Sequence, residues 1–311
     1  MLGDRGCCFT FHRLAPAAHW AELPNREFHL DAGFLIRLLQ YLRQTGWAIV
    51  SMDEALRRSA QPGGGRFVNF SVDDCYRDTA EAVLPLFRQF GAPITLYLQT
   101  GIPDGTDWLR DAGLETILQQ REDVTDDGMR YRLATAKARR AAFAAIARRW
   151  DAGDGAAKYL AFCHAHGFDP AALQAKHAIT WEMLEAIGDD PSVEIGAHTA
   201  SHPHLARLAE ADAAAEIAGS RRRIEQRLRR RVRHFAFPFG RRADCGPRDF
   251  ALARAAGFVS AATTRKGLLR PGRDPFSLPR NTLNGSHRRM WQAEAHLSGA
   301  TGTLARIAGR V

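Results

Sequence analysis

Apolar residues along the chain follow two patterns, one typical of buried strands and one typical of amphipathic helices. Short apolar runs of strand length occur at residues 7–12, 47–51, 66–72, 94–100, 193–198, 234–240 and 258–264. Segments with apolar residues at helical spacing lie between them, at residues 31–45, 52–58, 79–90, 180–187, 208–229 and 246–255. Strands that alternate with helices in this way favour a parallel sheet, so the chain is predicted to adopt an α/β fold.

Residues 104–178 interrupt the alternation. This segment is rich in alanine and arginine, its pattern is helical, and it contains no strand pattern. We interpret it as a helical insertion on a loop between a strand and the next helix. The tail after about residue 285 is predicted to form one helix. By length alone, 311 residues could form one or two domains, and a single α/β barrel of this size is ordinary.

The chain is strongly basic, with a net charge of +9, which by itself would suit a nucleic-acid ligand. Much of the excess is local, because residues 221–233 contain eight arginines, many of which would lie on the solvated face of a helix. Nothing else in the sequence favours nucleic acid, so no such partner is predicted. An anionic small substrate or a charged membrane surface remains an alternative reason for the charge.

The cysteines and the apolar runs bear on the compartment. There are five cysteines, an odd number, and their spacing matches no zinc ribbon or disulfide framework, which favours reduced thiols. The first residues contain no apolar stretch long enough for a signal peptide, and no run of 18 apolar residues occurs elsewhere. We therefore expect a cytoplasmic location and no transmembrane segment.

Candidate chemistry stands at the carboxyl ends of predicted strands, the edge at which α/β folds build their sites. Asp73 and Asp74 end the strand at 66–72. Because side chains alternate along a strand, the two carboxylates point in different directions, so one could bind a metal while the other faces a substrate. A helix N-cap is the alternative interpretation of this pair.

Two histidines follow the strand at 193–198, in the sequence HTASH. His198 and His202 are at positions i and i+4, and on one helical turn they could bind the same cation. Neutral imidazole suits zinc and neighbouring transition metals. Together with Asp74, the histidines would leave coordination positions open, as a catalytic metal requires.

The strand at 234–240 ends in Pro238, Phe239 and Gly240. A strand that ends in proline and glycine turns sharply and can expose backbone N–H groups, which can stabilise an oxyanion. The alternative is a hydrophobic strand followed by an ordinary turn.

The three motifs resemble those of the polysaccharide deacetylase family, the NodB-homology carbohydrate esterases. FSVDDC is similar to the family's T-F-D-D-G, HTASH matches H-[ST]-x-x-H, and AFPFG is similar to R-x-P-[YF]-G. The resemblance covers residues 7–100 and 179–283. It implies a distorted (β/α) barrel of the NodB type with a helical insertion at about 104–178, so that residues 1–311 form one catalytic domain.

The resemblance also implies a reaction, the metal-dependent hydrolysis of an N-acetyl group on an amino sugar of a polysaccharide or glycan precursor. Asp74, His198 and His202 would bind a divalent metal, with zinc expected and cobalt, manganese or nickel as alternatives. Asp73 would be the general base, and the backbone N–H of Phe239, next to Pro238, would stabilise the oxyanion. The expected partner is a carbohydrate that bears an N-acetylated sugar. Neither the sugar nor the oligomeric state can be read from the sequence.

The general acid is less directly indicated. Many family members use a histidine in an L-x-H motif near the C-terminus, and His287 and His296 lie in other contexts. Phe11-His12-Arg13 resembles the N-terminal aromatic-His motif of a permuted subgroup. His12 is therefore predicted to be the acid that protonates the leaving amine.

Two departures from the family pattern leave alternatives open. Ala236 stands where the family has an arginine, for which Arg280 or Arg77 are possible replacements, and Cys75 stands where it has a glycine. A deformylase or another amide hydrolase on the same scaffold is one alternative. A catalytically inactive carbohydrate-binding homologue is the other.

Overall fold

The computed structural model describes residues 5–15, 17–61, 63–151, 154–188 and 190–307. Its main sheet is parallel, and its strands lie in the order β11-β10-β9-β6-β5-β1-β12, with β4 paired to the first part of β5. The strands are β1 (Arg5–Phe11), β4 (Ala48–Ile49), β5 (Arg66–Asp74), β6 (Ile94–Leu98), β9 (Val193–Ala197), β10 (His234–Ala236), β11 (Ser260–Ala262) and β12 (Asn281–Thr282).

The sheet curls into a distorted barrel. Leu278 forms a parallel bridge to Ala262 at the end of β11, and β12 pairs with β1, so the segment before β12 lies between the two ends of the sheet. Every residue of β5 after Arg66 is buried, as expected for a strand covered on both faces. The predicted α/β fold, a distorted (β/α) barrel, is confirmed.

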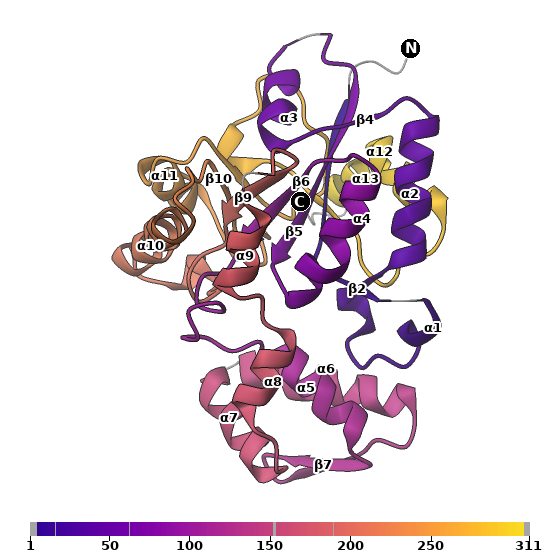
Figure 1. The fold of residues 1–311 in the computed structure, drawn as a ribbon, viewed down its shortest axis with the longest axis vertical. Coiled ribbons are helices and arrows are strands. Elements are labelled where there is room, and N and C mark those ends of the chain that lie inside the picture. Colours follow the sequence, from indigo (N-terminus) through magenta and orange to yellow (C-terminus); the bar gives the residue numbers. More distant parts are fainter. Residues whose placement is uncertain (1–4, 16, 62, 152–153, 189, 308–311) are drawn as a thin grey trace.

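Helices that follow the strands surround the sheet (Figure 1). Several begin at a side-chain cap: Asp31 accepts from the Phe34 N–H, Ser51 from Glu54 and Thr180 from Met183. These barrel helices are α2 (Ala32–Gln44), α3 (Met52–Ser59), α4 (Leu84–Gln89), α9 (Trp181–Ile187), α10 (Glu210–Leu228) and α11 (Pro247–Ala255). Shorter turns are η1 (Arg26–Phe28), the π-helical turn η2 (Thr79–Val83), η3 (Leu205–Arg207) and η4 (Pro275–Ser277).

The described residues of the segment at 104–178 form four helices with an apolar cluster of their own. They are α5 (Arg110–Gln120), α6 (Ala136–Asp151), α7 (Gly155–Ala165) and α8 (Pro170–His177). The prediction that this segment contains no strand is wrong, because β7 (Asp123–Asp126) and β8 (Met129–Arg132) form an antiparallel hairpin. Asp127 and Gly128 both have positive φ in its turn, as an Asp-Gly hairpin turn requires. That the whole chain is one domain with an insertion stays a prediction.

A buried polar network attaches the insertion to the barrel. Glu115 of α5 bonds to His29, with Oε2 2.8 Å from the imidazole Nε2, and its Oε1 accepts the Asn25 N–H at 2.9 Å. Arg13 donates to Asp78 at 3.4 Å, and its guanidinium lies 3.9 Å from Glu115. Because these partners are buried or half-buried, the network fixes α5 above the carboxyl ends of the strands.

Three further elements differ from the predictions. Strand β10 ends at Ala236 rather than at residue 240, since Pro238 has no N–H and Phe239 has a φ of 58°. The tail forms two helices, α12 (Met290–Leu297) and α13 (Ala300–Ile307), separated at Gly299 with a φ of 82°. The short elements α1 (Ala17–Trp20), β2 (Arg13–Ala15) and β3 (His29–Asp31) follow β1 and were not predicted.

Among the residues that the structure describes, no helix has both the length and the apolar character needed to cross a membrane.

Candidate metal centre and active site

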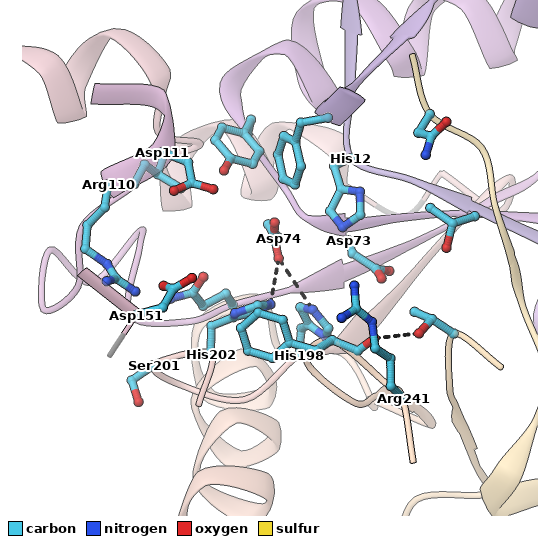
Figure 2. A pocket seen from close by; sticks show the side chains of 18 of the residues that line it. His12, Asp73, Asp74, Arg110, Asp111, Asp151, His198, Ser201, His202 and Arg241 are labelled. Atoms are coloured by element: carbon cyan, nitrogen blue, oxygen red, sulfur yellow. Dashed lines mark hydrogen bonds and ion pairs between the residues drawn. The ribbon is translucent and has the colours of Figure 1, made fainter. Parts of the chain in front are cut away.

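A cavity of about 1050 Å³ opens at the carboxyl ends of the strands, and Figure 2 shows its lining from close by. Residues at or soon after the carboxyl ends of five neighbouring strands reach it: His12, Asp73, Asp74, Gln99, His198 and Phe239. The strands are parallel, so their carboxyl ends lie at one edge of the sheet. This topology brings together motifs that are far apart in the sequence.

The three predicted metal ligands converge in this cavity. Asp74 Oδ1 lies 3.4 Å from Nε2 of His198 and 3.4 Å from Nε2 of His202 (Figure 2). The three ligand atoms all lie within 4.8 Å of one another. Asp74 Oδ1 is buried and has no hydrogen-bond partner among the described residues. A buried carboxylate oxygen without a partner, beside two imidazole nitrogens, fits a divalent cation of the zinc class.

The tautomer of His198 and the pKa values of His202 and Asp74 also suit a cation. His198 Nδ1 lies 2.8 Å from the Ala236 carbonyl, to which it donates, so Nε2 is the nitrogen left for the cation. Burial lowers the pKa of His202 to about 4, which leaves its imidazole neutral near pH 7. Burial alone would raise the pKa of Asp74, but His202 and His198 hold it well below its usual value.

The histidines do not lie on a helix, and that part of the sequence interpretation is wrong. Strand β9 ends at Ala197, and the residues after it form an irregular turn in which Thr199 and His202 have φ of 63° and 54°. Glu216 of α10 accepts the backbone N–H of Ala200 at 2.8 Å and of Ser201 at 3.0 Å. The turn, rather than helical spacing, therefore points both imidazoles at Asp74.

Backbone strain is concentrated at this site. Of the seven non-glycine residues with positive φ in the described chain, five are Asp74, Cys75, Thr199, His202 and Phe239. Each such residue costs on the order of 1–3 kcal/mol, and such residues cluster at active sites. Cys75, at a φ of 64°, stands where the resembled family has glycine. Burial raises the pKa of its thiol well above the usual value, so it is a neutral packing residue.

Asp73 forms a buried ion pair with Arg280. The guanidinium donates to Asp73 Oδ1 at 2.6 Å and to Oδ2 at 2.8 Å, and it also donates to Ser71 at 3.0 Å. Burial alone would raise the pKa of Asp73, but Arg280 helps to hold it below its usual value. Asp73 is therefore a positioned, ionised carboxylate beside the predicted metal site.

Arg280 also accounts for the missing family arginine. Ala236 is buried in β10 and has no charge to offer. Of the two candidate replacements, Arg77 donates to the Ala175 carbonyl and lies near Glu81, away from Asp73. Arg280 reaches Asp73 from the segment that closes the barrel before β12.

Of the three histidines considered as the acid, His12 is the one that lines the cavity. It directly follows β1, and its ring packs on Phe28 with centroids 4.3 Å apart. Burial lowers its pKa, against the opposing effect of Asp74 and Asp73. His287 and His296 instead face each other, with their Nε2 atoms 3.1 Å apart.

The family model for polysaccharide deacetylase matches residues 60–258, which is more than half of the chain. The chain belongs to the polysaccharide deacetylase family. The subgroup with the N-terminal aromatic-His motif stays a prediction, because His12 lies before the matched residues. No curated protein sequence matches the chain.

Solved structures with a similar fold include proteins from several bacteria. Streptococcus pyogenes deacetylase PplD in complex with acetate has 13% identity and a TM-score of 0.62, over 94% of this chain and 98% of that one. IcaB from Ammonifex degensii has 18% identity and a TM-score of 0.63, over 96% and 98%. The putative polysaccharide deacetylase BA0330 from Bacillus anthracis has 11% identity and a TM-score of 0.60, over 95% and 69%. At these identities the likeness shows a shared fold.

In this deacetylase-family protein, Phe239 lies at the cavity with its backbone in the left-handed region. Its N–H makes no hydrogen bond with any described residue, while its ring packs parallel to His204 with centroids 3.8 Å apart. Pro238 is not part of the cavity lining, and its carbonyl accepts the Gly240 N–H at 2.6 Å. Phe239 therefore has a backbone N–H that can bond to a ligand, whereas Pro238 has none.

Part of the lining of this family member was missed by sequence reasoning. The insertion and the tail contribute residues outside the resemblance: Asp107, Trp108, Arg110, Asp111, Asp151, Thr301 and Leu304. No motif marks them, and only their position over the strand ends brings them to the site.

A second group of possible ligands lies at the amino ends of β9 and β10. His234 Nε2 lies 3.3 Å from Asp53 Oδ1 and 3.9 Å from Glu194 Oε1. Asp53 Oδ1 also accepts from Arg233 at 3.0 Å, and Glu194 accepts the N–H groups of Met52 and Asp53. Since these carboxylates already have partners, we interpret the group as an ion-pair cluster that anchors α3.

Proposed function

We propose that this protein is a metal-dependent N-deacetylase that hydrolyses the N-acetyl group of an amino sugar in a polysaccharide or glycan precursor. Family membership supports a carbohydrate deacetylase. The observation that carries the metal dependence is the convergence of a buried Asp74 oxygen, which accepts no hydrogen bond, with His198 and His202, next to the ionised Asp73.

The residues around the cavity divide the chemistry among them. A divalent cation, zinc or else cobalt, manganese or nickel, held by Asp74, His198 and His202 would acidify a water and polarise the acetyl carbonyl. Asp73 accepts the proton of the attacking water, for which its ionised state is required. The water oxygen bonds to the carbonyl carbon and the C–N bond breaks, giving acetate and a free amine.

Two further groups act on the oxygen and the nitrogen of the amide. The unbonded N–H of Phe239 stabilises the charge that develops on the carbonyl oxygen. His12, at the cavity wall, gives a proton to the leaving nitrogen, since an amine leaves only when protonated.

A His12→Gln variant tests the role of the acid. We expect kcat for the amide substrate to fall by about 10²- to 10⁴-fold, the usual contribution of general acid catalysis. The loss should be much smaller for 4-nitrophenyl acetate, because nitrophenolate leaves without a proton. Equal losses on the two substrates, or no loss on the amide, would refute the role of His12.

Release of acetate and of formate from matched substrates decides the acyl group. We expect acetate from an N-acetylglucosamine tetramer, and much slower formate release from the N-formyl tetramer. Faster formate release would favour the deformylase alternative. Release of neither acid from these or other N-acylated sugars, by protein that binds metal, would favour the inactive carbohydrate-binding homologue.

A further inference from the structure

The turn that presents the Phe239 N–H at the cavity is strained. Phe239 has a φ of 58°, and the carbonyl of Pro238 accepts the N–H of Gly240, two residues further on, at 2.6 Å. A hydrogen bond that spans one residue of positive φ makes a γ-turn of the rare, strained form. Such a conformation persists only where the surrounding contacts hold it in place. The direction of the Phe239 N–H therefore depends on those contacts.

The segment after β11 holds the backbone on one side of this turn. The Thr264 hydroxyl donates to the Phe239 carbonyl at 2.5 Å, and the Thr264 N–H donates to the Gly240 carbonyl at 3.1 Å. The two segments lie so close that a Cβ added at Gly240 would come within 2.5 Å of the Thr264 nitrogen. Both hydrogen bonds act after the Phe239 Cα atom, and neither involves the Phe239 ring.

The ring of Phe239 is held by two histidines. It lies parallel to the His204 ring, with an interplanar angle of 5° and centroids 3.8 Å apart. On another side it meets the ring of His202 in a T-shaped contact, with centroids 4.7 Å apart. A side chain packed against two rings has little freedom to change rotamer, so its backbone is held with it. His204 does not line the cavity, so it can affect a ligand there only through Phe239.

Asp244 holds His204 in this position. The imidazole Nδ1 of His204 donates to Asp244 Oδ1 at 2.8 Å, and the Asp244 side chain is buried. Asp244 Oδ2 accepts the N–H of Arg241 at 3.0 Å, and its carbonyl accepts the N–H of Ala206 at 3.0 Å. Asp244 thus joins the segment after β9 to the segment after β10, which contains Phe239. A buried carboxylate with both oxygens bonded holds its partners in one arrangement.

We propose that His204 is a positioning residue, whose ring, held by Asp244, keeps the Phe239 N–H directed at the carbonyl oxygen of the acyl group that is hydrolysed. This inference rests on the proposed function, in which that N–H stabilises the oxyanion. The stacked ring of His204 acts on Phe239, and the hydrogen bond to Asp244 fixes the ring.

Two variants separate the ring of His204 from its hydrogen bond. His204→Asn keeps a donor for Asp244 but removes most of the stacked ring, whereas His204→Phe keeps a flat ring without the donor. In His204→Asn, kcat for acetate release should fall about tenfold to 10²-fold, less than the 10²- to 10³-fold loss typical of removing an oxyanion donor. KM should change little, because the oxyanion forms only in the transition state. His204→Phe should keep kcat within a few-fold of the wild type.

The substrate dependence and the metal content identify the origin of the loss. His204→Asn should lose the same factor on the amide and on 4-nitrophenyl acetate, because an oxyanion forms on both, in contrast to His12→Gln. Its metal content should equal that of the wild type, since the three converging ligands are retained. Loss of metal would assign the effect to His202 and overturn the proposal. A kcat in His204→Phe as low as that in His204→Asn would also overturn it.

His166→Asn is the matched control. His166 also packs on a phenylalanine, Phe162, with ring centroids 4.4 Å apart, and both residues lie in the insertion and outside the cavity lining. The same substitution at this position should leave kcat within a few-fold of the wild type on both substrates. A loss here as large as in His204→Asn would contradict a role specific to His204.

Hydrogen exchange at the turn, measured on metal-free protein, separates this inference from the function on which it rests. The Gly240 N–H is bonded across Phe239, so it should exchange faster in His204→Asn than in the wild type and in His204→Phe. If no protein releases acetate but this difference is observed, the proposed function fails and His204 still positions Phe239. If acetate is released but Gly240 exchanges at the same rate in all three proteins, the positioning role is refuted while the deacetylase function stands.

Discussion

Asp73→Asn is expected to lower kcat for acetate release by about 10²- to 10⁴-fold while the protein still binds its metal. Asparagine keeps the shape of the side chain and one oxygen acceptor, but it cannot take a proton from water. Asp73 is not among the three converging ligands, so the metal content should be unchanged. The measurement is kcat at saturating N-acetylated tetramer, with metal quantified in the same sample.

The stability of this variant has to be measured beside its activity. Asp73 neutralises Arg280, which is 0% exposed. Removing one partner of a buried ion pair typically lowers the free energy of unfolding by about 3–5 kcal/mol. Asparagine still accepts a hydrogen bond, so the decrease in the free energy of unfolding should be smaller. Thermal unfolding establishes that the assay temperature lies below the transition.

Asp78→Asn is the matched control for Asp73→Asn. Asp78 also pairs with an arginine, Arg13, at 3.4 Å, and it does not line the cavity. Its kcat should stay within a few-fold of the wild type. If folded, metal-loaded Asp73→Asn had a kcat similar to this control, Asp73 would not be the base.

The barrel and the convergence of Asp74, His198 and His202 could be predicted because the sequence patterns that mark them are local. A run such as residues 66–72 is apolar throughout since β5 is buried on both faces, and Asp73 and Asp74 come at its end. The parallel topology then brings these residues to the same edge as His198. His12 reached the cavity by the same rule, because it follows β1 directly.

The contacts that hold the side chains of the site in place could be predicted only in part. The sequence offered Arg280 and Arg77 equally as partners of Asp73. Arg280 comes to Asp73 because it directly precedes β12. That strand has two residues and is too short to produce a recognisable sequence pattern. The turn after β9 depends on Glu216, a residue of the following helix, so the local pattern alone suggested a helix.

The insertion was the least predictable part. The hairpin of β7 and β8 was not predicted because β8 is largely exposed and polar, so it has no apolar strand pattern. The Asp-Gly turn between the strands is a recognised hairpin pattern and was the one available signal. The part of the cavity lining that the insertion contributes depends on how α5 sits on the barrel. Contacts between Glu115 and His29, which are far apart in sequence, fix that placement.

His202→Ala is expected to abolish both metal binding and activity. It removes one of three ligands and leaves Asp74 and His198 alone, too few to retain a zinc-class ion through dialysis. A catalytic metal supplies several kcal/mol of transition-state stabilisation, so kcat/KM should fall by about 10²- to 10⁴-fold. His164→Ala, an exposed histidine of the insertion, is the control and should keep both properties.

The most direct test of metal dependence is to measure metal content by mass spectrometry and acetate release on the same samples. The wild type and His202→Ala would be compared after dialysis against chelator and again after addition of zinc or cobalt. We expect about one divalent ion per chain in the reconstituted wild type, with acetate release that follows its metal content, and neither in His202→Ala. Acetate release by the wild type at an unchanged rate without metal would contradict the proposed mechanism.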